Sequence, residues 1–262
     1  MKNGKIFSIA NQKGGTGKSS AAINLGKALA ISGHNVLCAD MDPQANLSMG
    51  LGIERPDELT MTMHEVLARI ADSGELPTKS EYIMRSGNLD VIPSNINLSV
   101  TEINLRNELG GERILSELME PLRADYDYIV LDTSPSIGML TINALAACDS
   151  VIIPVSPQLW SATGLTDLLQ TIFKIKRKIN PRIEIEGILL TMCDERTRLF
   201  RDAKALLEGF CGDRIKLFET RIPSTVKVGE ANYSSVSIME FDAKSKAAIA
   251  YTEFAKEVAG HA

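Results

Sequence analysis

Residues 5–20 read KIFSIANQKGGTGKSS, and this stretch decides the fold of the chain. Lys5 to Ala10 is a short apolar run, which predicts a buried strand. Beyond the glycine-rich loop, apolar residues recur with helical spacing, which predicts a helix over 17–31 that ends at Gly33. The apolar positions are Ala21, Ala22, Leu25, Ala28 and Leu29. A strand, a glycine-rich loop and a helix in this order are typical of a phosphate-binding loop.

The loop departs from the pattern G-x-x-x-x-G-K-[ST] at one position, because Gln12 stands where the first glycine is expected. Glycines let backbone N–H groups turn toward phosphates, and the helix N-terminus adds the positive end of its dipole. We expect Lys18 to reach the β- and γ-phosphates and Ser19 to bind Mg²⁺. The sequence therefore predicts a Mg·ATP-dependent P-loop ATPase. The expected nucleotide contacts in the loop are Lys13, Gly14, Gly15, Thr16, Gly17, Lys18, Ser19 and Ser20.

Further short runs rich in β-branched residues alternate with helical patterns along the chain. The expected strands are 36–39, 89–92, 128–131, 151–155 and 185–191. Such alternation predicts an α/β fold with a doubly wound, mostly parallel sheet and helices on both faces. We find no repeat and no low-complexity linker, so we expect residues 1–262 to form a single P-loop ATPase domain.

Composition and charge narrow the class of protein. The 262 residues are 44% hydrophobic and 23% charged, as in an ordinary globular chain. No apolar run approaches the roughly 20 residues needed to cross a bilayer, and the N-terminus lacks the parts of a signal peptide, so we expect a cytoplasmic protein. Four cysteines stand singly, which favours reduced structural thiols over a zinc site or disulfides.

The net charge of -5 is unevenly distributed. Residues 1–149 hold 12 Lys+Arg against 19 Asp+Glu, a balance of -7, whereas residues 150–262 hold 16 against 14, a balance of +2. The second part of the chain can therefore carry a basic surface.

Aspartates follow two of the expected strands. Asp132 comes directly after 128–131, so the sheet would deliver its carboxylate to the Mg²⁺ shell. Asp40 and Asp42 follow the strand at 36–39. For this second pair a helix cap or turn is the alternative explanation, and the nearby phosphate loop makes it the poorer one.

The run KGGTGKSS, with its early lysine, resembles the deviant Walker A motif of the ParA and MinD family of ATPases. The resemblance continues from Ile6 to about Val258 and is greatest to the ParA branch. It includes ADMDPQAN at 39–46, LTINAL at 140–145, EGILLTM at 186–192, and Ile222-Pro223 with Glu230-Ala231. It implies ATP and Mg²⁺ as cofactors, a homodimer in the ATP state, and a nucleoid-associated protein that binds nonspecific double-stranded DNA. It also implies a ParB-like adaptor that stimulates hydrolysis.

The resemblance also implies roles for single residues. Lys13 would cross the dimer interface to the partner's phosphates, the alternative being a solvated lysine on a loop. Asp42 would position the attacking water, and Pro223 would contact the nucleotide. The catalytic candidates are thus Lys13, Lys18 and Asp42, and the metal candidates are Ser19, Asp42 and Asp132.

The resemblance places nonspecific DNA binding at Arg196 and Lys227, and Arg198 lies beside the first of these. The alternative is that these cations are solvated helix faces, which is the better explanation for the cluster at 174–178 because cations are favoured at a helix C-terminus. The chain departs from the family pattern at Ser134-Pro135, Leu159-Trp160 and 223–227. These departures bear on the partner surface and on DNA binding, since Lys227 offers a point charge instead of a guanidinium fork.

Other functions on the same fold are less well supported by the sequence. Positioning of a non-DNA cargo is the main alternative. A MinD-like membrane ATPase needs a basic amphipathic C-terminal helix, and residues 255–262 hold one lysine and no large apolar face. An iron protein needs a second cysteine at the right place near Cys148, and the sequence has none there. A ligase or synthetase gives Lys13 no evident role. The loop begins 12 residues from the start, so we expect no N-terminal helix-turn-helix domain and no operator-specific repression.

Overall fold

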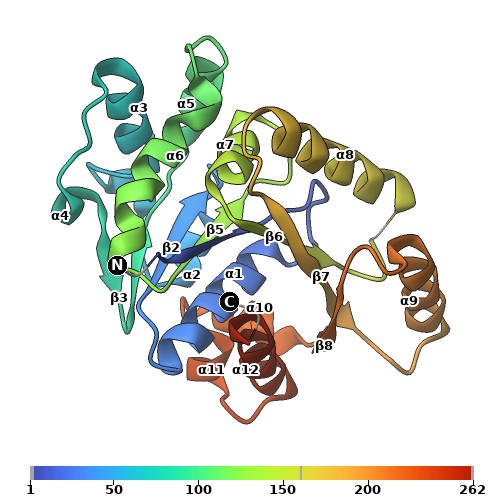
Figure 1. Cartoon of the computed structure of the whole chain (residues 1–262). Helices are drawn as coiled ribbons and strands as arrows, with labels where there is room; N and C mark the ends of the chain where they lie inside the picture. The colour runs from blue at the N-terminus through green and yellow to red at the C-terminus, as the bar shows by residue number, and fades with distance from the viewer. Residues whose placement is uncertain (1–2, 160, 261–262) are drawn as a thin grey trace.

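The computed structural model describes residues 3–159 and 161–260. An eight-stranded sheet crosses the middle of the molecule (Figure 1). Its strands lie in the order β3 (Met84–Ser86), β4 (Leu89–Ile92), β2 (Val36–Met41), β5 (Tyr128–Thr133), β1 (Lys5–Ile9), β6 (Ser150–Val155), β7 (Glu184–Cys193) and β8 (Leu217–Pro223). Neighbours pair in parallel, except that β3 runs antiparallel to β4 at the edge.

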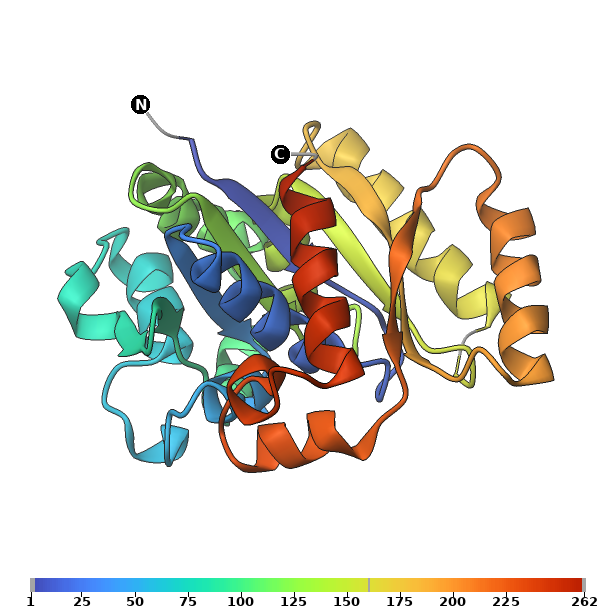
Figure 2. The same cartoon turned by 90° about the horizontal axis from the view of Figure 1, so that it is seen from below.

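Helices cover both faces of this sheet (Figures 1 and 2). One face packs against α3 (Met63–Ser73), α5 (Leu98–Leu105), α6 (Ile114–Met119), α7 (Met139–Ala147), α8 (Ala162–Lys178) and α9 (Arg198–Cys211). The other packs against α1 (Lys18–Ile31), α2 (Asn46–Gly50), α10 (Val226–Tyr233), α11 (Ile238–Phe241) and α12 (Lys246–Ala259). The short α4 (Lys79–Tyr82), η1 (Pro56–Glu58), η2 (Gly111–Arg113) and η3 (Glu120–Ala124) complete the connections.

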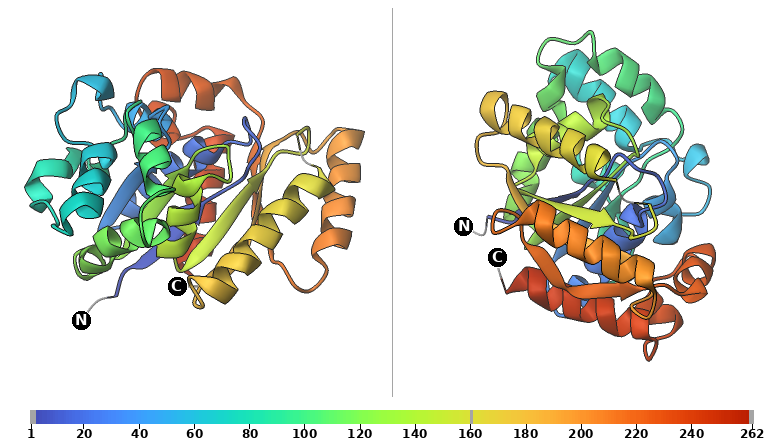
Figure 3. Two further views of the ribbon diagram at one scale, coloured as in Figure 1. Left: turned by 90° about the horizontal axis from the view of Figure 1, so that it is seen from above. Right: turned by 90° about the vertical axis from the view of Figure 1, so that its right-hand side faces the viewer.

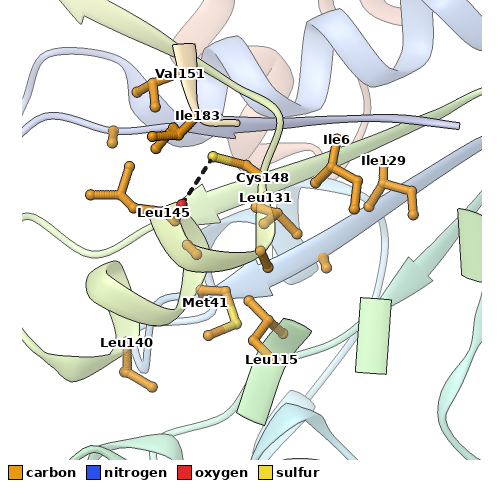
Figure 4. Close-up of a cluster of buried hydrophobic side chains, with 14 of the residues drawn as sticks. Ile6, Met41, Leu115, Ile129, Leu131, Leu140, Leu145, Cys148, Val151 and Ile183 are labelled. Carbon is orange, nitrogen blue, oxygen red and sulfur yellow. Dashed lines mark hydrogen bonds between the residues drawn. The ribbon is translucent and has the colours of Figure 1, made fainter. Parts of the chain in front are cut away.

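Each face of the sheet has its own apolar core, as a doubly wound sheet requires. Figure 4 shows part of the core under α6 and α7, where strand side chains such as Ile6 and Leu131 meet Leu115 and Leu145 from the helices. Cys148 is buried in this cluster and its Sγ donates to the Leu145 carbonyl oxygen. All four cysteines are free and buried. Cys148 therefore contributes to packing and does not face a surface that a second subunit could share.

The predicted α/β fold is confirmed, and each predicted strand lies within two residues of its observed ends. The predicted helix after the loop is α1, which begins at Lys18. It ends as expected, because Gly33 has a φ of 93° just beyond the last turn, and the His34 N–H donates to the Leu29 carbonyl oxygen. Strands β3 and β8, which form the two edges of the sheet, were not predicted.

The topology brings the predicted site residues to one edge of the sheet. The chain passes from β1 toward β2 on one side and later returns to β6 on the other, so the strand order reverses at β1. Loops that follow the carboxyl ends of neighbouring strands meet at such a point and form the usual ligand crevice of a doubly wound sheet. Within the described ranges, no helix is both long enough and apolar enough to pass through a membrane.

Candidate active site

Hydrogen bonds join the start of the loop between β1 and α1 to residues far along the chain. Asn11 Nδ2 donates to the Pro154 carbonyl oxygen in β6 over 2.7 Å. Gln12 Nε2 donates to the Gly164 carbonyl oxygen in α8, also over 2.7 Å. The residue that breaks the usual loop pattern thus has a structural role, since it ties the loop to a helix more than 150 residues away.

The end of the loop adopts a backbone that glycine permits. Gly15 and Gly17 have φ values of 74° and 80°, in the left-handed region that side chains disfavour. Thr191 in β7 donates its hydroxyl to the Thr16 carbonyl oxygen over 2.8 Å, which fixes the loop against the sheet. Among the described residues, no side chain caps the start of α1. Its first N–H groups are therefore available to an anion.

Lys18 is buried at the start of α1, and its ammonium group faces the site. Its Nζ donates to the Lys13 carbonyl oxygen over 3.2 Å. Burial lowers the pKa of Lys18, while the carboxylates of Asp132 and Asp42 act in the opposite direction. A buried ammonium with one carbonyl partner has donors left over, so it is suited to bind phosphate oxygens.

Asp40 and Asp42 have different roles although they are two residues apart. Asp40 is fully buried and accepts hydrogen bonds from the Ser48 N–H, the Ser48 hydroxyl and the Asp42 N–H. Its carboxylate therefore holds α2 against β2. Burial raises the pKa of Asp40 to about 6, against the opposing effect of the Ser48 bonds. Asp42 accepts a bond from the Gln44 N–H at 3.0 Å and lies on the wall of the cavity described below.

Asp132 lies opposite Asp40 in the pairing of β5 with β2. It is fully buried, and neither of its carboxylate oxygens accepts a hydrogen bond of normal geometry from the described residues. Burial raises the pKa of Asp132 well above its usual range, and the neighbouring Asp40 adds to this, while the nearby Ser19 hydroxyl opposes it in part. Buried carboxylate oxygens without partners are costly. They indicate a place where a positive charge is expected.

Three oxygen-bearing side chains therefore surround the start of α1: Ser19, Asp42 and Asp132. Carboxylate and hydroxyl oxygens are hard ligands, which suit Mg²⁺. Asp132 supplies oxygens without partners, and Asp42 keeps part of its carboxylate free of protein bonds. The donor set fits the Mg²⁺ ion that the sequence predicts.

A cavity of about 570 Å³ opens above these groups. The loop supplies part of its wall through Gly14, Gly15, Gly17, Lys18, Ser19 and Ser20. Asp42, Pro135 and Met192 supply more, and α2 and α10 close the far side with residues such as Asn232. The structure thus brings most of the predicted loop residues and one predicted carboxylate onto a single cavity. Thr16 is buried behind the loop, and Lys13 is exposed beside it.

Pro223 does not line this cavity. It lies on a neighbouring cavity of about 660 Å³ between the end of β8 and the start of α9, together with Cys193, Phe200 and Arg221. Met192 lines both cavities. The two hollows are therefore adjacent.

Asn232 was not among the site residues predicted from the sequence. Its Nδ2 donates to the Ser20 hydroxyl over 2.9 Å, which joins α10 to the phosphate loop. Its Oδ1 is buried and has no partner among the described residues. The contact spans 212 residues. No local pattern in the sequence signals it.

The three predicted DNA-binding residues are exposed, and each has an acidic partner. Arg196 makes two bonds to Asp194, from Nε at 2.9 Å and from Nη2 at 3.1 Å. The Arg198 Nε lies 3.4 Å from an oxygen of Asp202. The third pair joins Lys227 to Asp242. The structure therefore places these cations at the surface in ion pairs, and Arg196 also lines the cavity that holds Pro223. Trp160, part of one departure from the family pattern, lies outside the described residues.

Comparison with known proteins identifies the family. Residues 4–185 match a family model described as an AAA domain. The chain is 40% identical over 258 residues to the sporulation initiation inhibitor protein Soj of Bacillus subtilis, which covers 98% of this chain and 99% of Soj. The chain belongs to the ParA/MinD-type P-loop ATPases.

Two further comparisons agree with this membership. The chromosome partitioning protein ParA of Caulobacter vibrioides is 39% identical over 256 residues, 97% of this chain and 93% of that protein. The cobyrinic acid a,c-diamide synthase of Mycobacterium smegmatis, solved with bound ADP and magnesium, has a TM-score of 0.83 at 32% identity and covers 98% and 95% of the two chains. The predicted family, fold and ATPase activity are thus confirmed.

Proposed function

We propose that this chain is an ATP-dependent dimerising switch that binds nonspecific double-stranded DNA in its ATP-bound form. In this proposal it positions or segregates plasmid or chromosomal DNA on the nucleoid, in the cytoplasm. A ParB-like adaptor stimulates hydrolysis and so releases the DNA. Residues 1–262 act as one domain. The likeness to proteins named for sporulation control and chromosome partitioning supports this choice over other functions of the fold.

The nucleotide would extend across both cavities. Its phosphates would lie against the free N–H groups of the loop and the Lys18 ammonium. Its base would lie beyond Met192, where Pro223 lines the second cavity. This arrangement gives Pro223 the nucleotide contact that the family resemblance implies. The ATP analogue and magnesium bound in the cobyrinic acid a,c-diamide synthase of Mycobacterium smegmatis support a nucleotide and Mg²⁺ as the ligands.

Ser19, Asp42 and Asp132 would hold Mg²⁺, which neutralises phosphate charge when bound. Asp132 would then gain the partner that its buried oxygens need. Asp42 would orient the attacking water, and the bond from the Gln44 N–H fixes its carboxylate for this task. Lys18 would stabilise the charge that develops on the transferred phosphate.

The observation that carries the proposal is the position of Lys13. Its backbone carbonyl oxygen accepts bonds from Lys18 and from the Thr16 hydroxyl, so its main chain is fixed to the site. Its side chain nevertheless lies at the surface, with no ion pair among the described residues. An exposed lysine whose main chain is fixed in the phosphate loop is suited to reach phosphates in a second subunit.

One observation favours a second candidate, the positioning of a cargo other than DNA. Arg196, Arg198 and Lys227 are each neutralised by an acidic partner. DNA must displace Asp194, Asp202 and Asp242 before it can use these cations. A non-DNA cargo would leave these pairs intact.

The test uses Asp42→Ala, which should bind ATP and dimerise but hydrolyse it at least 100-fold more slowly, because the water is no longer oriented. With Mg·ATP this variant should retain unrelated DNA duplexes equally well, and with ADP it should release them. Fluorescence anisotropy measures DNA binding and light scattering measures dimerisation. Dimers without DNA affinity at low salt would favour the second candidate. A variant that stays monomeric in ATP would contradict the role given to Asp42.

A further inference from the structure

The end of α8 concentrates positive charge that the active site does not use. Lys174, Lys176, Arg177 and Lys178 are all exposed there, and the last three lie in the final turn of the helix. None of the ion pairs among the described residues involves them. This contrasts with Arg196, Arg198 and Lys227, which all have acidic partners. The helix dipole favours cations at this end, but it leaves their charges free.

An apolar cavity lies beside these cations. α8 and α9 leave a hollow of about 410 Å³ between them, over the start of β7. Phe173 and Phe210 stand at its sides and remain 57% and 36% exposed. Leu206, one turn before Phe210 on α9, is 63% exposed and extends the apolar surface. Two large exposed rings beside a cavity are unusual on a surface that binds no partner.

The charges at this cavity are mostly positive. Lys176 and Arg214 line it, and Glu184 is the one acidic side chain among its described lining residues. The remaining cations of the α8 end lie next to Lys176 along the helix. An apolar hollow bordered by unpaired cations is complementary to a segment that carries both apolar and acidic side chains.

This cavity and the cavity at the phosphate loop lie near opposite ends of β7. The former is lined by Ile185 near the beginning of β7, whereas Thr191 and Met192 near the end of that strand contact the phosphate loop and its cavities. Seven residues of strand separate the two regions by about 20 Å. Figures 1 and 3 show α8 and α9 beside each other at the β8 end of the sheet. A ligand here leaves the nucleotide and the Lys13 surface uncovered.

We propose that the cavity between α8 and α9 docks an acidic amphipathic helix of a partner protein. Apolar side chains of the partner enter between Phe173 and Phe210, and its carboxylates pair with Lys176, Arg214 and the end of α8. Duplex DNA matches the charge but has no apolar side chains to fill the hollow. A membrane favours apolar residues that protrude, whereas this surface is hollowed. The docking site does not depend on the proposed DNA binding.

A fluorescein-labelled peptide of 16 residues tests the site, with leucine and phenylalanine on one helical face and glutamate on the other. Anisotropy should show saturable binding to the wild-type chain that weakens with salt. Phe173→Ser should weaken it roughly tenfold through lost apolar burial. Lys176→Glu should weaken it roughly two- to fivefold. The matched controls are Ile249→Ser and Lys256→Glu on α12, both exposed changes on the other face, which should leave binding unchanged.

Peptide variants complete the design. Replacing the peptide's apolar residues by alanine, or its glutamates by lysine, should abolish binding. Melting curves and ATPase rates should match the wild type for all four protein variants, which shows that they fold. Peptide binding that is absent, or equal in Phe173→Ser, overturns the proposal. The proposal is also overturned if Phe173→Ser leaves peptide binding unchanged but abolishes another interaction. These interactions are binding of single-stranded DNA, duplex DNA or phosphatidylserine vesicles, and self-association of the chain.

Discussion

Charges near the phosphate loop and charges around the starts of α9 and α10 are arranged in opposite ways. Lys18 and Asp132 are buried with too few partners, and their pKa values shift because of burial. Arg196 and Lys227 are exposed and paired with acids. Unpaired buried charges raise the free energy of the ligand-free chain, and binding a ligand of opposite charge removes this cost. Paired surface charges gain little from a new partner. We therefore expect high affinity for nucleotide and low affinity for DNA.

Removing the buried cation should have the largest effect. Lys18→Ala should weaken ATP binding by roughly 30- to 150-fold, because about 2 to 3 kcal/mol of charge-assisted hydrogen bonding to the phosphates is lost. Isothermal titration calorimetry with Mg·ATP measures this. The matched control is Lys27→Met, a buried lysine on the same helix that bonds to Ser86 and Glu240. It should lower stability and leave ATP affinity unchanged. Undiminished affinity in Lys18→Ala would refute the phosphate-loop assignment.

Removing the buried anion should stabilise the ligand-free chain. Asp132→Asn should raise the free energy of unfolding by roughly 1 to 3 kcal/mol, because a desolvated charge beside Asp40 disappears. Thermal melting should show an increase of several degrees. The same variant should lose the Mg²⁺-dependent part of its ATP affinity. Asp40→Asn is the control, and it should be destabilising because that carboxylate accepts three hydrogen bonds.

The stabilisation by Asp132→Asn should depend on pH. In the folded chain Asp132 and Asp40 keep their protons to higher pH than in the unfolded chain, Asp40 to about 6. The unfolded chain therefore binds fewer protons between about pH 4 and 6, and this pair lowers stability as pH rises through that window. The melting difference between variant and wild type should be smallest near pH 4 and should grow as pH rises toward the raised pKa of Asp132. A difference that grows on acidification would contradict the assignment.

Changes at the paired surface should have the smallest effects. Arg196→Glu should weaken DNA binding on unrelated sequences alike and lower the slope of log K against log salt by about two per dimer. Asp194→Ala, which frees the Arg196 guanidinium, should tighten binding two- to fivefold. Salt titrations by anisotropy, with dimerisation checked in parallel, measure both. If Asp194→Ala weakens binding, Arg196 is not the DNA contact and the ion pair is purely structural.

The sequence was sufficient for features that depend on local pattern. The buried strands are continuous apolar runs, and the loop lies between a strand and a helix that both have strong signals, so β1 and α1 were predictable. β3 is three residues long and includes the exposed Arg85, and β8 holds three successive polar residues, Glu219 to Arg221, at a sheet edge. Neither has the continuous apolar run on which the prediction relied.

The supports of the site were not predictable, because they join residues far apart in the chain. Gln12 reads as a defect in the loop pattern until its bond to Gly164 is seen. Asp40 and Asp42 have the same residue type and similar surroundings in sequence. Their different roles depend on where Ser48 and Gln44 lie in the fold. Similarly, the ion pairs of Arg196 and Lys227 depend on side-chain directions that no spacing fixes.

We propose that Lys13 acts across a dimer while Lys18 acts within its own subunit. Light scattering of Lys13→Ala and Lys18→Ala with Mg·ATP, alongside calorimetric ATP binding, tests it most directly. We predict that Lys13→Ala binds ATP within about threefold of the wild type, since its ammonium lies outside the cavity, yet stays monomeric and loses hydrolysis. Lys18→Ala should fail already at binding. If Lys13→Ala forms normal ATP-dependent dimers, Lys13 does not act across the dimer. It is then a solvated surface lysine, as we would expect for a synthetase on this fold.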